Sequence, residues 1–192
     1  MNPEMISEFL RTVAEATERI ALDYFQVARA GIKDRAYLER VYCYEFYHQF
    51  RAKQIERAEQ AGRTQQKDIL SGLILNGEPD KSAYPLITGK PKPDFIMHLP
   101  RTMEHNFAVM EVKRRYGLRM DVFRGDLKKL SDFISPPANY YLGVYLIFGE
   151  GKLNGWRNKA KKIAATDSGI KLDQITLLHH TECGKPAEKV EW

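Results

Sequence analysis

Two apolar segments separated by an amphipathic one constrain the fold more than any other feature of this sequence. Residues 107–110 and 140–148 (YYLGVYLIF) are apolar on both faces of an extended chain, which is typical of strands inside a central sheet. Between them, residues 120–134 repeat apolar side chains at helical spacing. This alternation predicts an α/β sandwich in which helices flank a buried sheet.

Weaker signals of the same kind extend the pattern along the chain. They predict helices at 1–31, 35 to about 60 and 154–165, and strands at 69–75, 95–99, 106–112 and 174–180. The expected order is helix, helix, strand, strand, strand, helix, strand, helix, strand, in a single domain with a central mixed sheet. We divide this domain into an N-terminal helix (1–31), a core (about 34–149), and a C-terminal helix and strand (150–192).

Composition narrows the classes of protein to which the chain can belong. The two cysteines, Cys43 and Cys183, form no metal-ligand pattern, which favours a reduced, cytoplasmic protein over a disulfide scaffold. The longest charge-free stretch, residues 133–149, contains two adjacent prolines and is shorter than the ~20 residues of a membrane span. The net charge of +5 permits nucleic acid as a partner without requiring it.

The residues that carry chemistry are Asp94, Glu111 and Lys113. Glu111 and Lys113 are two positions apart in an expected strand and therefore point to the same face. Apolar neighbours surround Glu111, and a carboxylate in such surroundings is costly unless it is paired or holds a metal. The same residues also suit a plainer interpretation, in which Asp94 caps a surface strand and Glu111 and Lys113 form a neighbouring ion pair.

A register argument brings the two carboxylates together. If the second and third expected strands form a hairpin, Leu99 faces Asn106 and Asp94 faces Glu111, at roughly 5 Å. Two carboxylates at that separation repel one another unless a cation lies between them. Hard oxygen ligands favour Mg²⁺, so the sequence predicts a magnesium site at this end of the hairpin.

The connection of 18 residues at 76–93 is rich in proline and glycine, and loops of that length in compact domains are often functional. It contains a second Pro-Asp pair, at Asp80. This pair lies in a polar, turn-like run with no apolar strand directly after it, so Asp94 is the better candidate for a metal ligand.

Pro93-Asp94, a spacer of 16 residues and Glu111-Val112-Lys113 together resemble the PD-(D/E)XK nuclease superfamily. The resemblance implies a restriction-endonuclease-like core of helix, strand, strand, strand, helix and strand (αβββαβ) over the core defined above. It implies that Asp94 and Glu111 bind Mg²⁺, for which Mn²⁺ can substitute, and that Val112 contributes its carbonyl to the metal. It also implies that Lys113 assists the attacking water.

The resemblance extends to the neighbouring helices. Many members carry a glutamate on the helix before the first core strand, and Glu45 matches that position; the alternative for it is an exposed or salt-bridged carboxylate. Asp126 and Lys129 lie on the helix after the motif strand, where such nucleases often place further polar residues. Helical spacing places Glu45 on an inner stripe that consists of Leu38, Val41, Glu45 and His48.

The sequence therefore predicts a Mg²⁺-dependent nuclease that hydrolyses DNA phosphodiester bonds, without membrane association. Basic residues after the motif strand would contact the phosphate backbone, and the alternative for them is a solvated helix face. These basic residues are Arg114, Arg115, Arg119, Lys128 and Lys129.

Two other functions suit the same residues. The chain could be a catalytically inactive, nuclease-like subunit that binds nucleic acid or another protein in a defence or repair complex. It could also be a nuclease directed at RNA, because nothing in the sequence shows whether a 2′-hydroxyl is read. The sequence leaves open both a homodimer and an association with a partner subunit.

Overall fold

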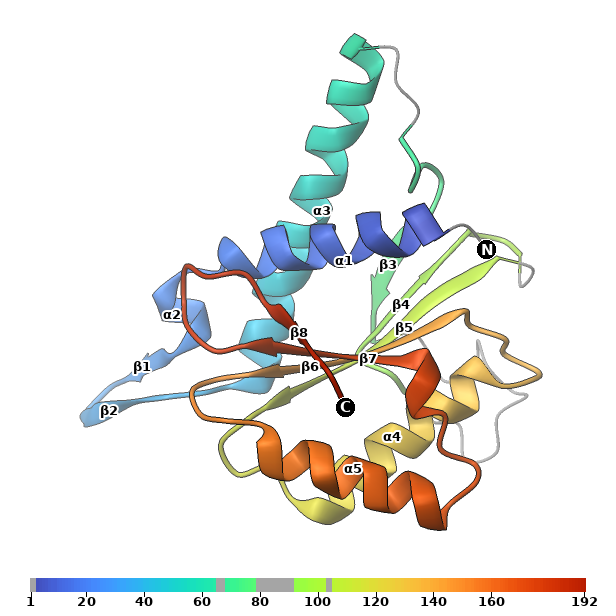
Figure 1. The fold of residues 1–192 in the computed structure, drawn as a ribbon. Helices are drawn as coiled ribbons and strands as arrows, with labels where there is room; N and C mark the ends of the chain where they lie inside the picture. Colours follow the sequence, from blue (N-terminus) through green and yellow to red (C-terminus); the bar gives the residue numbers. More distant parts are fainter. Residues whose placement is uncertain (1–2, 65–67, 79–91, 103–104) are drawn as a thin grey trace.

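The computed structural model describes residues 3–64, 68–78, 92–102 and 105–192. A six-stranded mixed sheet lies between two helical layers, with α1 and α3 on one face and α4 and α5 on the other (Figure 1). The predicted α/β class, with a central mixed sheet flanked by helices, is confirmed. The elements are α1 (Pro3–Glu18), α2 (Leu22–Phe25), β1 (Val27–Arg29), β2 (Ile32–Ala36), α3 (Glu39–Thr64), β3 (Ile74–Gly77), β4 (Phe95–His98), β5 (Asn106–Arg114), α4 (Met120–Ile134), β6 (Leu142–Phe148), α5 (Asn154–Thr166), the short 3₁₀ helix η2 (Leu172–Gln174), β7 (Ile175–His180) and β8 (Glu188–Val190).

The pairing of neighbouring strands changes from antiparallel to parallel at β5. β3, β4 and β5 are antiparallel neighbours, whereas β5, β6 and β7 run parallel and β8 returns antiparallel to β7. α4 lies in the crossover between β5 and β6, as the connection of two parallel neighbours requires. β6 is buried along its whole length, because it has a strand on each side and a helical layer on each face.

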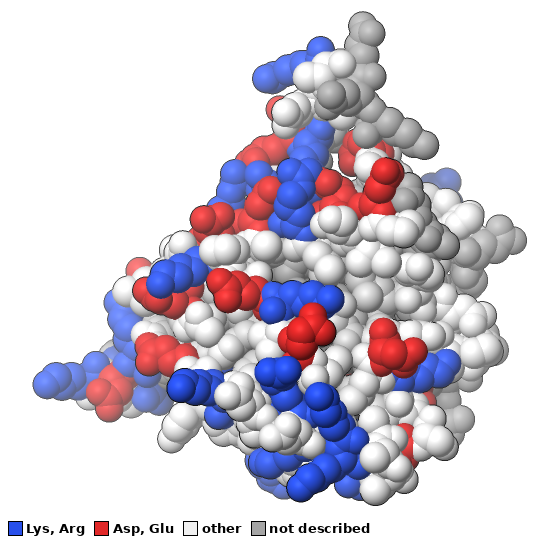
Figure 2. Space-filling model, in the orientation of Figure 1, with Lys and Arg blue, Asp and Glu red and all other residues white. Residues whose placement is uncertain are grey.

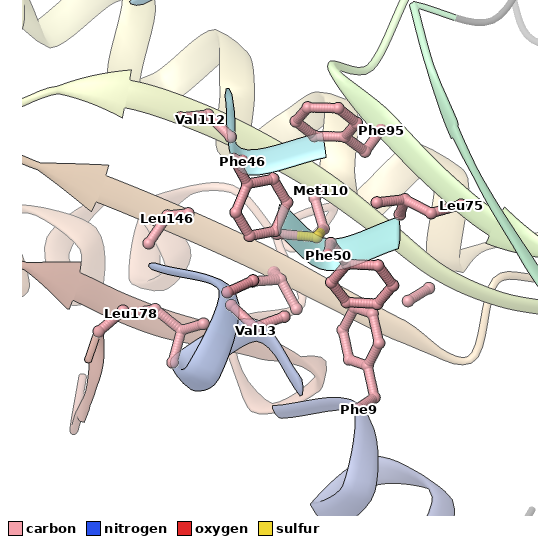
Figure 3. Packing of buried hydrophobic residues seen from close by; sticks show 14 of the residues in the cluster. Phe9, Val13, Phe46, Phe50, Leu75, Phe95, Met110, Val112, Leu146 and Leu178 are labelled. Atoms are coloured by element: carbon pink, nitrogen blue, oxygen red, sulfur yellow. The ribbon is translucent and has the colours of Figure 1, made fainter. Parts of the chain in front are cut away.

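The side chains of β5 alternate between the two layers, and this alternation positions the candidate site. Met110 and Val112 pack with the phenylalanines of α1 and α3 (Figure 3). Val109 instead packs in the cluster that contains α4. Glu111 and Lys113 share the parity of Val109, so both side chains point to the α4 face of the sheet.

The N-terminal segment differs from the helix predicted over 1–31. α1 ends at Glu18, and residues 27–36 form a two-stranded hairpin of β1 and β2. Gly31, at the turn of this hairpin, has a φ of 72°, a left-handed conformation that glycine adopts without steric cost. Gly31 therefore closes a turn and does not end a helix.

The start of α3 also differs from the prediction. It begins at Glu39 and not at Arg35, because β2 occupies the chain as far as Ala36, and it continues through Gly62 to Thr64. None of the described helices is both long and apolar enough to cross a lipid bilayer.

The strands before the motif are shorter than predicted. β3 begins at Ile74, because residues 69–72 form a turn. Asp80 and most of the connection 76–93 lie outside the described residues. At the other end of the chain, β8 has no counterpart among the predicted strands.

The predicted hairpin register holds near the motif and fails at the far end. Phe95 lies opposite Met110, which is the register that places Asp94 beside Glu111. An irregularity after Met97 then shifts the pairing, so that His98 lies opposite Asn106. The predicted pairing of Leu99 with Asn106 is therefore wrong, because the extra residue in β5 displaces it.

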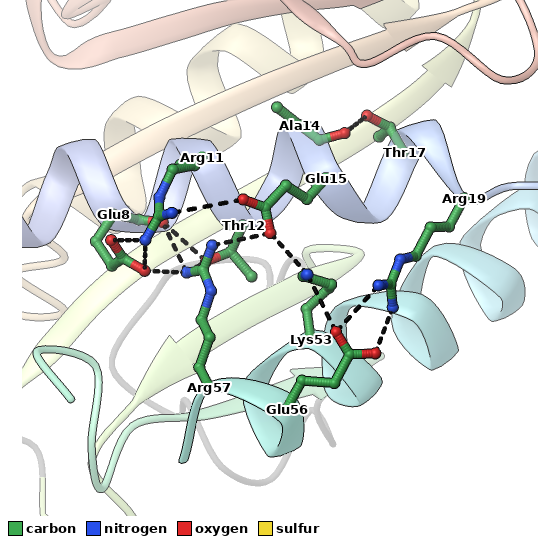
Figure 4. Close-up of polar contacts among 10 residues, drawn as sticks. All are labelled: Glu8, Arg11, Thr12, Ala14, Glu15, Thr17, Arg19, Lys53, Glu56 and Arg57. Atoms are coloured by element: carbon green, nitrogen blue, oxygen red, sulfur yellow. Dashed lines mark hydrogen bonds and ion pairs between the residues drawn. The ribbon is translucent and has the colours of Figure 1, made fainter. Parts of the chain in front are cut away.

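A network of ion pairs joins α1 to α3 (Figure 4). Arg57 of α3 contacts Glu8, Thr12 and Glu15 of α1, and its side chain is only 13% exposed. Lys53 and Glu56 extend the network along α3; Lys53 bridges Glu15 and Glu56, and Glu56 also pairs with Arg19.

Replacing Arg57 with Ala should lower the free energy of unfolding by about 1–3 kcal/mol, because it leaves two partly buried carboxylates with fewer partners. Urea denaturation measures this change. Arg63→Ala is the matched control, since Arg63 lies in the last turn of the same helix, is 81% exposed and pairs with Glu59. We expect the control to stay within about 0.5 kcal/mol of the wild type. Equal effects of the two substitutions would contradict a stabilising role for the contacts of Arg57 with α1.

Candidate functional site

The structure brings together Asp94, Glu111 and Lys113 where β4 begins and β5 ends. Asp94 directly precedes β4, and its Oδ2 accepts a hydrogen bond of 2.7 Å from the backbone N–H of Val112. Lys113 Nζ lies 3.6 Å from Asp94 Oδ2 and 3.7 Å from Glu111 Oε2, so a single ammonium group contacts both carboxylates. The carbonyl of Val112 also faces this group, since it accepts a hydrogen bond of 3.0 Å from Lys113 Nζ.

α4 supplies a second lysine and a third carboxylate. Lys129 Nζ lies 2.9 Å from Glu111 Oε2 and 3.5 Å from Asp126 Oδ1. Tyr145 of β6 donates a hydrogen bond of 3.1 Å to Asp126 Oδ2 and holds that carboxylate in place. Lys129 was predicted at a basic rim and also, with Asp126, among the further polar residues after the motif strand; in the structure it pairs with Glu111 and Asp126.

The helix glutamate that contacts the site is Glu39 and not Glu45. Glu39, at the start of α3, accepts a hydrogen bond of 3.0 Å from Lys113 Nζ. The structure does not bring Glu45 to this group: its carboxylate is bonded to Gln49, one turn further along α3. Six positions separate the two glutamates, which turns Glu45 away by roughly two thirds of a helical turn.

The reason for this difference is the phase of α3. The inward stripe of the helix consists of Tyr42, Phe46 and Phe50, which are fully buried. The predicted stripe started from Leu38, which is 37% exposed. The sequence contained the better signal, because aromatic residues at 42, 46 and 50 repeat at four-residue steps and place Glu39 on the same face.

Burial dominates the electrostatics of two carboxylates of the site, Glu111 and Asp126. Glu111 is fully buried, and neither of its oxygens accepts a hydrogen bond of good geometry. Burial, together with the neighbouring charge of Asp94, raises the pKa of Glu111 well above its ordinary value. Burial likewise raises the pKa of Asp126. An added cation next to these groups would therefore be stabilising.

Both lysines stay charged in this environment. Burial by itself would lower the pKa of Lys113, but the surrounding carboxylates, with Asp94 first among them, outweigh it and raise that pKa. For Lys129 burial also acts to lower the pKa, and Glu111 is the main group that raises it. Lys113 is consequently a hydrogen-bond donor and a positive charge at neutral pH, and not a base.

The remaining predicted basic residues lie on the surface, each with a local partner. Arg114 donates to the carbonyl of Tyr37, and Arg115 donates to the carbonyl of Lys152. Their contact with nucleic acid stays a prediction. Lysine and arginine side chains also gather over α5 on the face shown in Figure 2. Two further predicted residues pair along the chain, Arg119 with Asp121 and Lys128 with Asp132.

The oxygen donors at the site suit a hard cation that takes few ligands from the protein. Within the described ranges, no three His, Cys, Asp or Glu side chains are grouped so as to hold a metal ion by themselves. Mg²⁺ commonly keeps several waters and takes only one or two carboxylates. Glu111, whose buried Oε1 lacks a hydrogen-bond partner, and Asp94, which shares Lys113 with it, fit such a site.

An open cleft of about 650 Å³ adjoins the site on the α3 side and reaches Glu39 and Asp94. These two acidic side chains are partly exposed, so a solute in the cleft has access to the edge of the charged group. Comparisons of the chain with protein-family models, with curated proteins and with solved structures found no match.

Proposed function

We propose that this protein is a metal-dependent nuclease with a restriction-endonuclease-like core, which hydrolyses DNA phosphodiester bonds beside Asp94, Glu111 and Lys113. The observation that carries the proposal is the fully buried Glu111, whose Oε1 lacks a hydrogen-bond partner and whose Oε2 shares the ammonium group of Lys113 with Asp94. The order α3, β3, β4, β5, α4, β6 supports it, because it is the order expected of such a core.

Mg²⁺ would be held by Asp94, Glu111 and the carbonyl of Val112. Glu39 would take the role of the helix glutamate that the sequence resemblance assigned to Glu45. When bound, the ion supplies a Lewis acid that acidifies a water and stabilises negative charge on the phosphate. Lys113, which stays protonated, would donate hydrogen bonds to the attacking water or to a phosphate oxygen. Lys129 of α4, which also pairs with Asp126, holds Glu111 in place.

We place the protein in the cytoplasm, with DNA as its partner. Cys43 and Cys183 are free thiols, which suits a reducing compartment. The basic face over α5 suits a polyanionic partner (Figure 2).

A second candidate is a nuclease-like module that binds nucleic acid without cleaving it. The observation in its favour is that Glu111 already has two ammonium groups within 4 Å, those of Lys113 and Lys129. These two ammonium groups compensate the charge of Glu111 without a metal, which suits a purely structural role for the cluster.

A cleavage assay on the full chain separates the candidates. Supercoiled plasmid, single-stranded DNA and single-stranded RNA of one sequence are each incubated with Mg²⁺, Mn²⁺ or EDTA. The proposal predicts cleavage of DNA with either metal and none with EDTA. Binding without cleavage under every condition favours the second candidate, and cleavage of RNA alone moves the proposal to an RNA-directed nuclease.

A further inference from the structure

The cleft beside Asp94 is lined in part by residues that the proposed hydrolysis does not use, Arg40, Tyr44, Tyr47 and Glu78 among them. It lies between α3 and the strands β3 and β4, and it has a volume of about 650 Å³. Its chemically distinctive lining residues are Glu39, Arg40, Tyr44, Tyr47, Glu78 and Asp94.

Two tyrosines present their rings to the solvent of this cleft. Tyr44 and Tyr47 are three positions apart on α3 and therefore share a face of the helix. Tyr44 is 59% exposed and Tyr47 is 37% exposed, although both carry large apolar rings. Exposed aromatic rings next to a polar site are typical of surfaces on which a planar ligand stacks.

Neighbouring side chains hold both rings in place. Arg40 Nε donates a hydrogen bond of 2.7 Å to the hydroxyl of Tyr44, and the Arg40 guanidinium lies 5.6 Å from the centre of that ring. The ring of Tyr47 lies parallel to that of Phe95, within 3°, at a centroid distance of 6.4 Å. Because Phe95 is buried in the core, it fixes the orientation of Tyr47.

The charges of the cleft favour a nucleobase over a phosphate. Among the lining residues that the structure describes, Glu39, Glu78 and Asp94 contribute three carboxylates and Arg40 contributes one guanidinium. The ammonium of Lys113 also contacts Glu39 and Asp94, so these groups together keep a net negative charge. A phosphate would be repelled by this lining wherever no cation is bound beside it. A base is neutral and stacks on aromatic rings, and adenine, cytosine and guanine carry amino groups that donate hydrogen bonds to carboxylates.

We propose that this cleft binds an unpaired nucleobase of a single DNA strand, which stacks on Tyr47 and Tyr44. The bases of a duplex are stacked and paired inside the helix, so they reach such a cleft only when they are unpaired or flipped out. The inference rests on the proposed function for one point, that the phosphate next to this base lies at Asp94 and Glu111. It names single-stranded DNA as the substrate class.

Binding measurements test the cleft independently of cleavage. Fluorescence anisotropy is recorded with a labelled single strand, with a strand of equal length made of abasic units, and with a duplex, all in EDTA. Tyr47→Ala and Tyr44→Ala should each raise the Kd for the single strand about tenfold. Neither substitution should change the Kd for the abasic strand or the duplex more than about twofold.

Matched variants separate stacking from other effects of substitution. Tyr47→Phe and Tyr44→Phe keep a ring, so each should stay within about twofold of the wild-type Kd. Tyr141→Ala removes a tyrosine of similar exposure, 41%, outside this cleft and should leave every Kd unchanged. The Tm of each variant is measured alongside. If an Ala variant unfolds, the wild type still tests the inference, because equal Kd values for the single strand and the abasic strand would contradict it.

The outcomes distinguish this inference from the proposed function. If the alanine variants bind the single strand as the wild type does, or lose the abasic strand equally, the base-binding inference fails whether or not DNA is cleaved. If base binding depends on the tyrosines but no metal supports cleavage, the inference holds for the cleft and the nuclease proposal fails.

Discussion

Replacing Asp94 with Asn should lower Mg²⁺-dependent DNA cleavage at least about a thousandfold while the protein stays folded. Asn has nearly the same shape, and its side-chain oxygen can still accept the hydrogen bond from the N–H of Val112. It lacks the negative charge that would hold the cation. Removing one electrostatic group from a phosphoryl-transfer site typically costs a factor of this size, which corresponds to about 4 kcal/mol of barrier.

Single-turnover cleavage of a labelled oligonucleotide, measured across a Mg²⁺ titration, gives the rate and the apparent metal affinity separately. Asp121→Asn is the matched control, because Asp121 is an exposed aspartate at the start of α4 that pairs with Arg119. It should cleave at the wild-type rate. A wild-type rate for Asp94→Asn in the same assay would remove Asp94 from the proposed site.

The central part of the fold could be predicted because its signals are strong and independent of distant contacts. Residues 107–110 and 142–148 are buried on both faces, and such strands leave an apolar run that polar positions do not interrupt. The hairpin of β1 and β2 leaves no such signal. Most of its residues are exposed, so no burial pattern marks them as strands.

The proximity of Asp94 to Glu111 could be predicted by counting residues across the expected hairpin. Antiparallel pairing fixes which residues share a face, and the irregularity in the hairpin lies beyond Met97, on the side away from Asp94. The contribution of α3 could not be fixed in the same way, because an error of one position in the phase of a helix moves a side chain by about 100°. Because of this error, the prediction named Glu45 where the structure places Glu39.

The ion pair between Lys129 and Glu111 was beyond sequence reasoning. The two residues are far apart in the sequence, and the pair forms because α4 packs over the face of β5 that carries Glu111. A basic residue on a helix usually lies on a solvated face, so nothing in the local pattern distinguishes Lys129 from Lys128. Packing makes the distinction, since Lys128 is exposed and pairs with Asp132.

A second large effect is expected outside the site, where His180 makes the stability of the protein depend on pH. Its ring is fully buried beside Phe25, and its Nδ1 lies 2.8 Å from the hydroxyl of Tyr42. Burial lowers the pKa of His180 to about 4, against 6.5 for an ordinary histidine. Between these two values the unfolded chain binds a proton that the folded protein does not bind, so lowering the pH favours unfolding.

The contribution of His180 is therefore complete above about pH 6.5 and is lost as the pH falls to about 4, with a total of about 3 kcal/mol at most. Urea denaturation from pH 7 to pH 4 measures it as a difference between proteins, which cancels the titration of the carboxylates. His180→Asn does not titrate in this range, so its free energy of unfolding should fall less steeply than that of the wild type, although it is lower at pH 7.

Tyr42→Phe separates burial from hydrogen bonding. It removes the hydroxyl that contacts His180 and leaves the ring buried, so the variant should keep the wild-type dependence on pH if burial is the main cause. Loss of the dependence in Tyr42→Phe would instead assign it to the hydrogen bond. Superimposable pH profiles of the wild type and His180→Asn would mean that the folded protein binds this proton as readily as the unfolded chain, and His180 would then have no part in acid unfolding.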